Sequence, residues 1–301
     1  MPSPTFAHVQ GMRHAAPVLE LSASSLSREE FWDKFVAKSL PCVIKGAVSH
    51  WPAMRNWRDR EYIKKRSGHR QVHYYPHENF ASPRQERQKE IISLSEALDR
   101  LHDENVAVGF VGTNNAVELL ADTGDLPFLG KVQPAFFYPF IRHFMYRNAG
   151  STWHYHAFDE TLMCQIVGTK QVGMLSLDNP HHFAIRNIFF QENYYDDPGS
   201  FAAFENAELN WFTATVQEGD ALYIPPLWWH GVITVSDGFG ITAPVPWRSP
   251  LPVIADGICK MAAGNADIVG KRAATNVGGL VAVARSLGLE KELALALQRG
   301  Y

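Results

Sequence analysis

The sequence predicts a mainly β protein, in which a sandwich or barrel of short strands lies between two helix-containing regions. Between residues 134 and 247, short apolar segments alternate with turns rich in Gly, Pro, Asn and Asp, a spacing typical of sandwiches and barrels. Helical signals lie before this region and again after residue 252. With 301 residues, 46% of them hydrophobic, the chain is long enough to bury a full core.

The region at 1–133 is predicted to be mixed α/β and to pack on the barrel. Residues 25–30 (SLSREE) have the pattern of a capped helix start. Residues 40–46 (LPCVIKG) indicate a short buried strand that ends at a glycine. A second helix is expected over 93–102, because its leucines and one alanine share a face.

The barrel itself is expected at 134–250. Its predicted strands are short apolar segments with turn residues between them: 161–167, 171–177, 210–216, 221–224, 231–235 and 240–244. Segments this short and this closely spaced favour an antiparallel sandwich or barrel over a parallel sheet with crossover helices.

The tail at 251–301 is predicted to be a C-terminal helical appendage. Ala, Leu, Gly and Lys dominate it, and the stretches 280–287 and 289–298 carry helical periodicity. The apolar faces of these helices would either pack back on the barrel or form a homodimer. The sequence pattern leaves both arrangements open.

Charge and cysteine content argue against several classes of protein. Lys and Arg number 28 against 31 Asp and Glu, for a net charge of −3, so we expect no nucleic-acid partner. Three cysteines without a CxxC pair argue against a disulfide framework and a structural zinc site, and they fit a reducing compartment. Without an apolar run of about 18 residues or a signal-peptide core, we expect a soluble, cytoplasmic protein with no membrane partner.

Histidine is the residue type that points to chemistry, and the chain has 13. In the segment GSTWHYHAFDE at 150–160, His154 and His156 are two residues apart. On a strand they would share a face and converge on one point. Imidazole is the commonest side-chain ligand of transition metals. An isolated pair of this kind is nevertheless more often two surface histidines than a metal site.

A second segment, QEGDALYIPPLWWHG at 217–231, contains His230. Its Gly-Asp pair indicates a turn, and a short apolar strand follows. His230 comes directly after two tryptophans, at the edge of a predicted core, where an imidazole needs a polar partner or a metal. Taken alone, the segment fits a core histidine bonded to a carbonyl as well as it fits a metal ligand.

Together these motifs resemble a known family. HxH, then GTK at 168–170, then GDxLYIPxxWWH are similar to the jumonji-C or cupin-like iron(II) and 2-oxoglutarate dependent oxygenases, among them asparaginyl and tRNA hydroxylases. The segment at 40–46, followed by WPA at 51–53 and by Trp57, is similar to the N-terminal signature of that family. The resemblance extends over about residues 25–247.

The resemblance implies a double-stranded β-helix, or jelly roll, with Fe(II) bound at the mouth of the barrel. Two of its ligands would be His154 and His230. The third position is His156, where the family has Asp or Glu. Three alternatives stay open: a three-histidine metal site, a carboxylate supplied by Asp159 or Glu160, or no functional iron site. Asp159 is an odd number of residues after His156 and would face away on a regular strand, unless a bulge intervenes.

The resemblance also implies a site for 2-oxoglutarate. Lys170 matches the lysine that binds the distal carboxylate of this cosubstrate, and Ser151 and Thr152 precede His154, where the family has a hydroxyl that contacts the same carboxylate. Near 242–246 the family often has an asparagine, and this chain has prolines, so that contact is expected to be lost.

We therefore expect a hydroxylase that uses Fe(II) and 2-oxoglutarate and acts on a small molecule or a peptide. One alternative is a cupin-like binding protein that has altered or lost its catalytic activity. Another is a three-histidine dioxygenase that does not use 2-oxoglutarate, and the presence of Lys170 argues against it.

Overall fold

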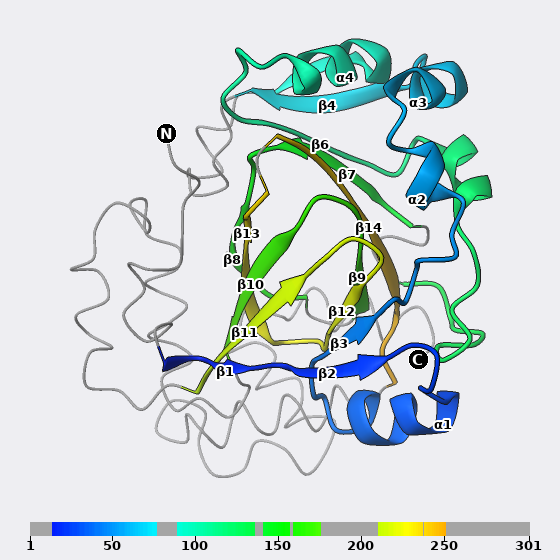
Figure 1. Cartoon of the computed structure of the whole chain (residues 1–301), viewed down its shortest axis with the longest axis vertical. Helices are drawn as coiled ribbons and strands as arrows, with labels where there is room; N and C mark the ends of the chain where they lie inside the picture. The colour runs from blue at the N-terminus through cyan, green and yellow to red at the C-terminus, as the bar shows by residue number, and fades with distance from the viewer. Residues whose placement is uncertain are drawn as a thin grey trace, which may run out of the picture.

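A computed structural model describes residues 14–76, 89–135, 141–156, 159–175, 210–236 and 238–250. The strands in these ranges form a five-stranded and a nine-stranded sheet, which face each other around an interior (Figure 1). Helices lie on the outside of the larger sheet. The predicted mainly β jelly-roll core is confirmed, whereas the predicted helical tail at 251–301 lies outside the described residues.

The smaller sheet has the strand order β1-β11-β10-β13-β8. Its members are β1 (Ala16–Pro17), β8 (Ser151–His154), β10 (Lys170–Leu175), β11 (Trp211–Val216) and β13 (Trp229–Thr234). β10 is antiparallel to both β11 and β13. This sheet therefore carries two of the histidine positions and the lysine that the sequence singles out.

The larger sheet has the order β2-β3-β12-β9-β14-β7-β6-β4-β5. Its members are β2 (Leu19–Ser22), β3 (Cys42–Lys45), β4 (Gln71–Pro76), β5 (Glu90–Ser93), β6 (Gly109–Thr113), β7 (His143–Arg147), β9 (Asp159–Val167), β12 (Ala221–Ile224) and β14 (Phe239–Arg248). The six strands expected in the barrel correspond to β9–β14. The sequence did not predict β4–β7, which extend the same sheet with residues from before the barrel motifs.

β14 is longer than predicted, because it continues through Pro244 and Pro246 to Arg248. Proline lacks the N–H that a central strand uses in its ladder. β7 pairs with β14 only as far as Thr242. Beyond this residue, the backbone of β14 on the β7 side has no β7 ladder that requires an N–H, so proline is tolerated there. β9 pairs with the other side along the whole stretch, and the strand persists.

The helix expected from the capped start at 25–30 is confirmed. α1 (Arg28–Phe31) continues into a π-helical turn at Trp32–Val36, and the Ser27 hydroxyl caps it by accepting from the Glu30 N–H at 3.0 Å. The sequence did not predict α2 (Ala53–Asn56), α3 (Arg60–Ser67) or the 3₁₀ helix at Val117–Asp122. None of the helices in the described ranges is long and apolar enough to cross a membrane.

α4 (Leu94–His102) confirms the helix expected at 93–102. Its predicted apolar face is completely buried, and it consists of Leu94, Ala97, Leu98 and Leu101. This face packs toward β4, and α3 lies beside α4 at the same end of the molecule (Figure 1).

The N-terminal region is tied to the barrel through the two motifs that the sequence singles out. β3 pairs with β12, so the 40–46 segment lies beside the GDxLYIP segment. At the turn before β12, the Asp220 carboxylate accepts from Lys45 Nζ at 2.5 Å and from the Gly46 N–H at 3.0 Å. Gly46 has a φ of +72°, a left-handed conformation that glycine adopts without strain. The two motifs therefore form one structural unit.

Candidate functional site

Two of the predicted metal ligands, His156 and His230, lie side by side. Their imidazole centroids are 4.9 Å apart, and the ring planes make an angle of 75°. His230 lies in β13 and is 2% exposed, and His156 follows the end of β8. The fold thus brings together two imidazoles that are far apart in the sequence.

His154 occupies the register position directly opposite His230, where β8 pairs with β13. Ser151, opposite Val232 in the same pairing, and Thr152 lie on the same short strand. β8 therefore carries one predicted metal ligand and both predicted hydroxyl contacts next to the His230 strand.

The protonation of His230 is set by a backbone carbonyl. Its Nδ1 lies 3.0 Å from the carbonyl oxygen of Trp228. A carbonyl oxygen can only accept, so Nδ1 carries the proton and the lone pair lies on Nε2. This is the tautomer in which a histidine can bind a metal through Nε2.

His156 is held at two points. Its ring Nδ1 lies 2.9 Å from the hydroxyl oxygen of Thr161 in β9. Its backbone carbonyl accepts from the Leu227 N–H at 2.7 Å. The first contact is made by the ring and the second by the backbone.

The loop between β12 and β13 connects the positions of both histidines. Its Leu227 N–H holds the backbone of His156, and its Trp228 carbonyl holds the ring of His230. Leu227 has a φ of +68°, which is unusual for a residue with a side chain. The loop is anchored in turn by the Trp228 indole N–H, which donates to the Ser39 carbonyl at 2.9 Å.

Lys170 is a buried cation at the start of β10. It is 6% exposed, and its Nζ lies 4.0 Å from the centroid of the Tyr146 ring. Burial lowers the pKa of Lys170 to about 7, because an apolar environment disfavours the charged form. No ion pair of Lys170 is found within the described ranges. A buried ammonium in this situation is well suited to bind an anion.

A neutral hydrogen-bonded network lies beside Lys170. Gln165 Nε2 donates to the Tyr146 hydroxyl at 2.8 Å, and the Thr242 hydroxyl donates to Gln165 Oε1 at 2.8 Å. Burial raises the pKa of Tyr146 well above its ordinary value. Sequence reasoning did not single out these three residues, although Gln165 and Thr242 are conspicuous as polar residues in apolar strands.

Asp159 does not follow the geometry assumed from the sequence. β8 ends at His154 and β9 begins at Asp159, so His156 and Asp159 do not lie on one regular strand. The expectation that Asp159 faces away from the histidines assumed such a strand and therefore no longer applies. Asp159 is 6% exposed and lies two residues before Thr161, which places both on the same face of β9.

Glu160 lies on the opposite face of β9, where it forms hydrogen bonds inside the core. Its carboxylate accepts from the Tyr223 hydroxyl at 2.7 Å and from the Ser249 hydroxyl at 2.5 Å. Burial raises the pKa of Glu160 to about 7. These contacts engage both of its oxygens away from His156, so Glu160 links β9, β12 and the end of β14.

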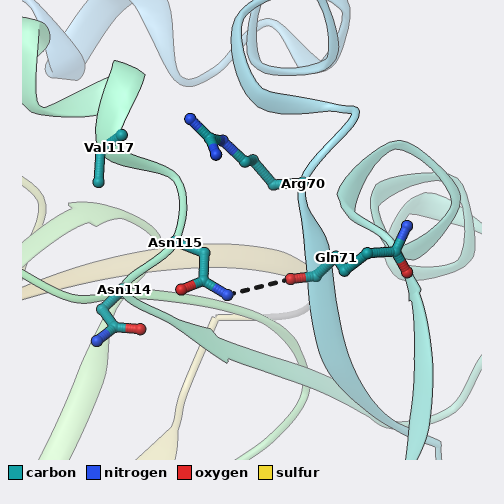
Figure 2. A pocket seen from close by; sticks show the side chains of 5 residues that line it. All are labelled: Arg70, Gln71, Asn114, Asn115 and Val117. Atoms are coloured by element: carbon teal, nitrogen blue, oxygen red, sulfur yellow. Dashed lines mark hydrogen bonds between the residues drawn. The ribbon is translucent and has the colours of Figure 1, made fainter.

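A separate surface pocket has a volume of about 390 Å³. It is lined by Arg70, Gln71, Asn114, Asn115 and Val117, as Figure 2 shows. Asn115 Nδ2 donates to the Gln71 carbonyl at 3.3 Å, and Arg70 is paired with Glu118. The lining contains none of the predicted site residues, so the pocket is separate from the candidate site.

Comparison with known proteins agrees with the motifs. Residues 28–250 match the family model described as the cupin-like domain. The chain is 26% identical to Jumonji C domain-containing protein 5 of Drosophila melanogaster, over 80% of this chain and 63% of that protein.

Two further relatives are similar at the same level. JmjC domain-containing protein D of Dictyostelium discoideum is 24% identical over 71% of this chain and 53% of its own length. Lysine-specific demethylase JMJ30 of Arabidopsis thaliana is 25% identical over 73% of this chain and 53% of its own length. The chain thus spans between about half and two thirds of these relatives. The matches confirm the resemblance that the motifs predict.

Proposed function

Since this chain belongs to the cupin-like domain family, we propose that it is an Fe(II)- and 2-oxoglutarate-dependent oxygenase. Its substrate would be a protein side chain or a small metabolite, and His154, His156 and His230 would bind the metal. The observation that carries the proposal is the buried Lys170, a cation without an ion pair among the described residues, in the same sheet as His230. The Arabidopsis relative is named a lysine-specific demethylase, which supports a protein substrate.

Two of the three proposed ligands are placed to share a metal, although the described residues contain no complete group of three His, Cys, Asp or Glu side chains that could hold one. The His230 tautomer has its lone pair on Nε2, and the His156 ring lies beside it. Imidazole nitrogens suit Fe(II), and a site with three protein ligands leaves positions open for other ligands. When bound, Fe(II) and 2-oxoglutarate would supply the oxidation: 2-oxoglutarate would lose CO₂ to give succinate, and one oxygen atom of O₂ would go to succinate and the other to the hydroxylated substrate.

The residues near Lys170 fit a dicarboxylate. A carboxylate next to the ammonium would favour its charged form and raise the pKa of Lys170 again. The ring of Tyr146 faces Nζ, and a ring face attracts a cation without neutralising it. The charge therefore stays available to a ligand. A metal site of three neutral imidazoles keeps the full charge of the iron, which also favours an anionic cosubstrate.

A second candidate has the metal bound by His154, His230 and Asp159. The buried position of Asp159 on the Thr161 face of β9 favours it. The variants His156→Gln and Asp159→Asn distinguish the two ligand sets. The first abolishes metal binding only if the site has three histidines, and the second abolishes it only if Asp159 is a ligand.

The test is metal analysis together with succinate release from 2-oxoglutarate by the purified protein. We expect bound iron and substrate-independent turnover, both lost in His230→Ala and both retained in His69→Ala, which alters an exposed histidine. Protein that takes up no iron and consumes no 2-oxoglutarate would refute the proposal. Protein that binds iron but consumes no 2-oxoglutarate would favour a dioxygenase that does not use 2-oxoglutarate.

The variant His156→Asp restores the acid that the family resemblance implies. A higher rate of succinate release would show that the native histidine is a degenerate ligand. An unchanged or lower rate would show that the rest of the site is adapted to histidine.

A further inference from the structure

We infer that the Lys170 site takes up a proton together with the carboxylate of its ligand, so that the affinity for 2-oxoglutarate falls as the pH rises above neutral. The inference rests on the proposed function for the identity of the ligand. The protonation of Lys170 in the ligand-free protein is a property of the chain alone, and it can be measured by itself.

The smaller sheet brings no charge to Lys170 at the positions beside it. Lys170 is 6% exposed, and its register partners are Val216 in β11 and Thr234 in β13. Val216 is apolar and fully buried. The Thr234 hydroxyl donates to the Ala149 carbonyl at 2.6 Å. The strands on both sides of Lys170 thus offer it an apolar side chain and a neutral hydroxyl.

The larger sheet is also neutral where it faces Lys170. The Tyr146 ring in β7 lies 4.0 Å from Nζ, and its hydroxyl accepts from Gln165 Nε2 in β9 at 2.8 Å. The Thr242 hydroxyl in β14 donates to the same amide group. The side chains of Gln165 and Thr242 do not titrate near neutral pH, and burial raises the pKa of Tyr146 well above its ordinary value. Near neutral pH this network therefore carries no charge.

The carboxylates in the turn after β11 have partners other than Lys170. Glu218 accepts from the Gly168 N–H at 2.7 Å and pairs with Arg58, and Asp220 pairs with Lys45. Burial alone lowers the pKa of Lys170 to about 7, and no charged neighbour among the described residues opposes it. Above about pH 7 the amine of the ligand-free protein is therefore mostly neutral.

A bound carboxylate changes this balance. It pairs far more strongly with an ammonium than with a neutral amine, and in a buried site it favours the charged form. The carboxyl groups of a ligand such as 2-oxoglutarate are ionised well below pH 7, so the ligand does not bring the proton. Above about pH 7 the proton comes from the solvent and goes to Lys170 Nζ, and the observed affinity falls as protons become scarce.

The first experiment follows the ε-carbon signals of ¹³C-labelled lysine in the zinc-saturated protein as the pH is raised. The signal of Lys170 is assigned from its absence in Lys170→Met. We expect Lys170 to titrate with a midpoint near pH 7 without ligand. With saturating 2-oxoglutarate the midpoint should lie about 1–3 pH units higher, the effect of an opposite charge next to the group.

The second experiment counts the protons by calorimetric titration with 2-oxoglutarate at pH 8, in buffers that differ in their enthalpy of ionisation. We expect the wild type to take up about 0.8 proton more than Lys170→Arg, because a guanidinium stays charged throughout. A water on the zinc also exchanges protons, but it contributes to both proteins and cancels in the difference. Between pH 7 and 8.5 the wild-type affinity should fall about 10-fold more than that of the variant.

The outcomes separate the inference from the proposed function. The inference is overturned, and the proposed function is not, if the protein binds 2-oxoglutarate while ligand-free Lys170 stays charged up to its ordinary pKa. Equal proton counts in the wild type and Lys170→Arg have the same meaning. A Lys170 that titrates near pH 7 in a protein without affinity for 2-oxoglutarate overturns the proposed function. If the larger guanidinium prevents binding, the Lys170 midpoint decides, and a midpoint that the bound ligand leaves unchanged overturns the inference.

Discussion

Replacing Lys170 by methionine is expected to stabilise the folded protein while removing its proposed binding of 2-oxoglutarate. Methionine has a similar unbranched shape and no charge. The Lys170 side chain is buried, and burial lowers its pKa from 10.5 to about 7. This difference corresponds to a cost of about 5 kcal/mol for burying the charged form at pH values below 7. The variant does not bear that cost.

The expected gain in stability of Lys170→Met over the wild type depends on pH. The unfolded chain keeps the Lys170 proton up to a pH of about 10.5, whereas the folded protein releases it above about 7. Between these values the unfolded state binds more protons, so the stability of the wild type rises with pH. The full free-energy cost of burying Lys170 applies to the wild type below pH 7 and disappears above pH 10.5. At pH 8.5 about 3 kcal/mol of it remains.

Urea unfolding of both proteins at pH 6 and pH 8.5 measures this difference. The advantage of Lys170→Met should shrink from about 5 to about 3 kcal/mol. Lys131 is exposed, and Lys131→Met should change the free energy of unfolding by no more than about 0.5 kcal/mol at either pH. A Lys170→Met protein no more stable than the wild type at pH 6 would refute the reasoning on burial.

Calorimetric titration with 2-oxoglutarate on the zinc-loaded protein measures the functional half of the prediction. Removal of one partner from a buried charge pair costs about 2–5 kcal/mol, so the affinity of Lys170→Met should fall by about 30-fold or more. An affinity equal to that of the wild type would refute the assignment of Lys170 to the cosubstrate.

Two further predictions concern the elements around the histidines. Trp228→Phe removes the 2.9 Å hydrogen bond to the buried Ser39 carbonyl, so the free energy of unfolding in urea should fall by about 1–3 kcal/mol. The variant should also bind zinc more weakly, because the same loop orients His230. An unchanged zinc affinity would contradict this prediction. Burial raises the pKa of Glu160 to about 7 from 4.5, so the folded protein binds more protons than the unfolded chain between these values, and stability falls by about 3 kcal/mol as pH rises through them. Glu160→Gln should lack this fall in urea unfolding at pH 4.5 and 7.5, and a fall of the same size in the variant would show that another group causes it.

Local patterns predicted the elements whose apolar residues show a helical or strand pattern in the sequence itself. The α4 helix is visible as an apolar face, and all four residues of that face are buried. The strands β9–β13 are visible as short apolar runs between turn residues. β14 was predicted too short because proline is a reliable strand breaker only where a ladder needs its N–H, and the structure leaves that side of β14 without the β7 ladder.

The strands β4–β7 were not predicted, because strand pairing depends on partners that are distant in the sequence. β6 has glycines at two of its five positions, which weakens any strand pattern. It is nevertheless held between β4 and β7. Likewise, the expectation that Asp159 faces away from His156 assumed a regular strand, and the chain does not provide one because β8 ends at His154 and β9 begins at Asp159.

The sequence by itself determined the chemical types available to the site: imidazoles at positions 154, 156 and 230, and an amine at Lys170. The type of side chain is a local property. Only the tertiary structure decided that His156 and His230 are adjacent, that Lys170 is buried and has a lowered pKa, and that Thr161 faces Nδ1 of His156. Protonation and tautomer depend on solvation and hydrogen bonds, and these come from strands that the fold brings together from separate parts of the chain.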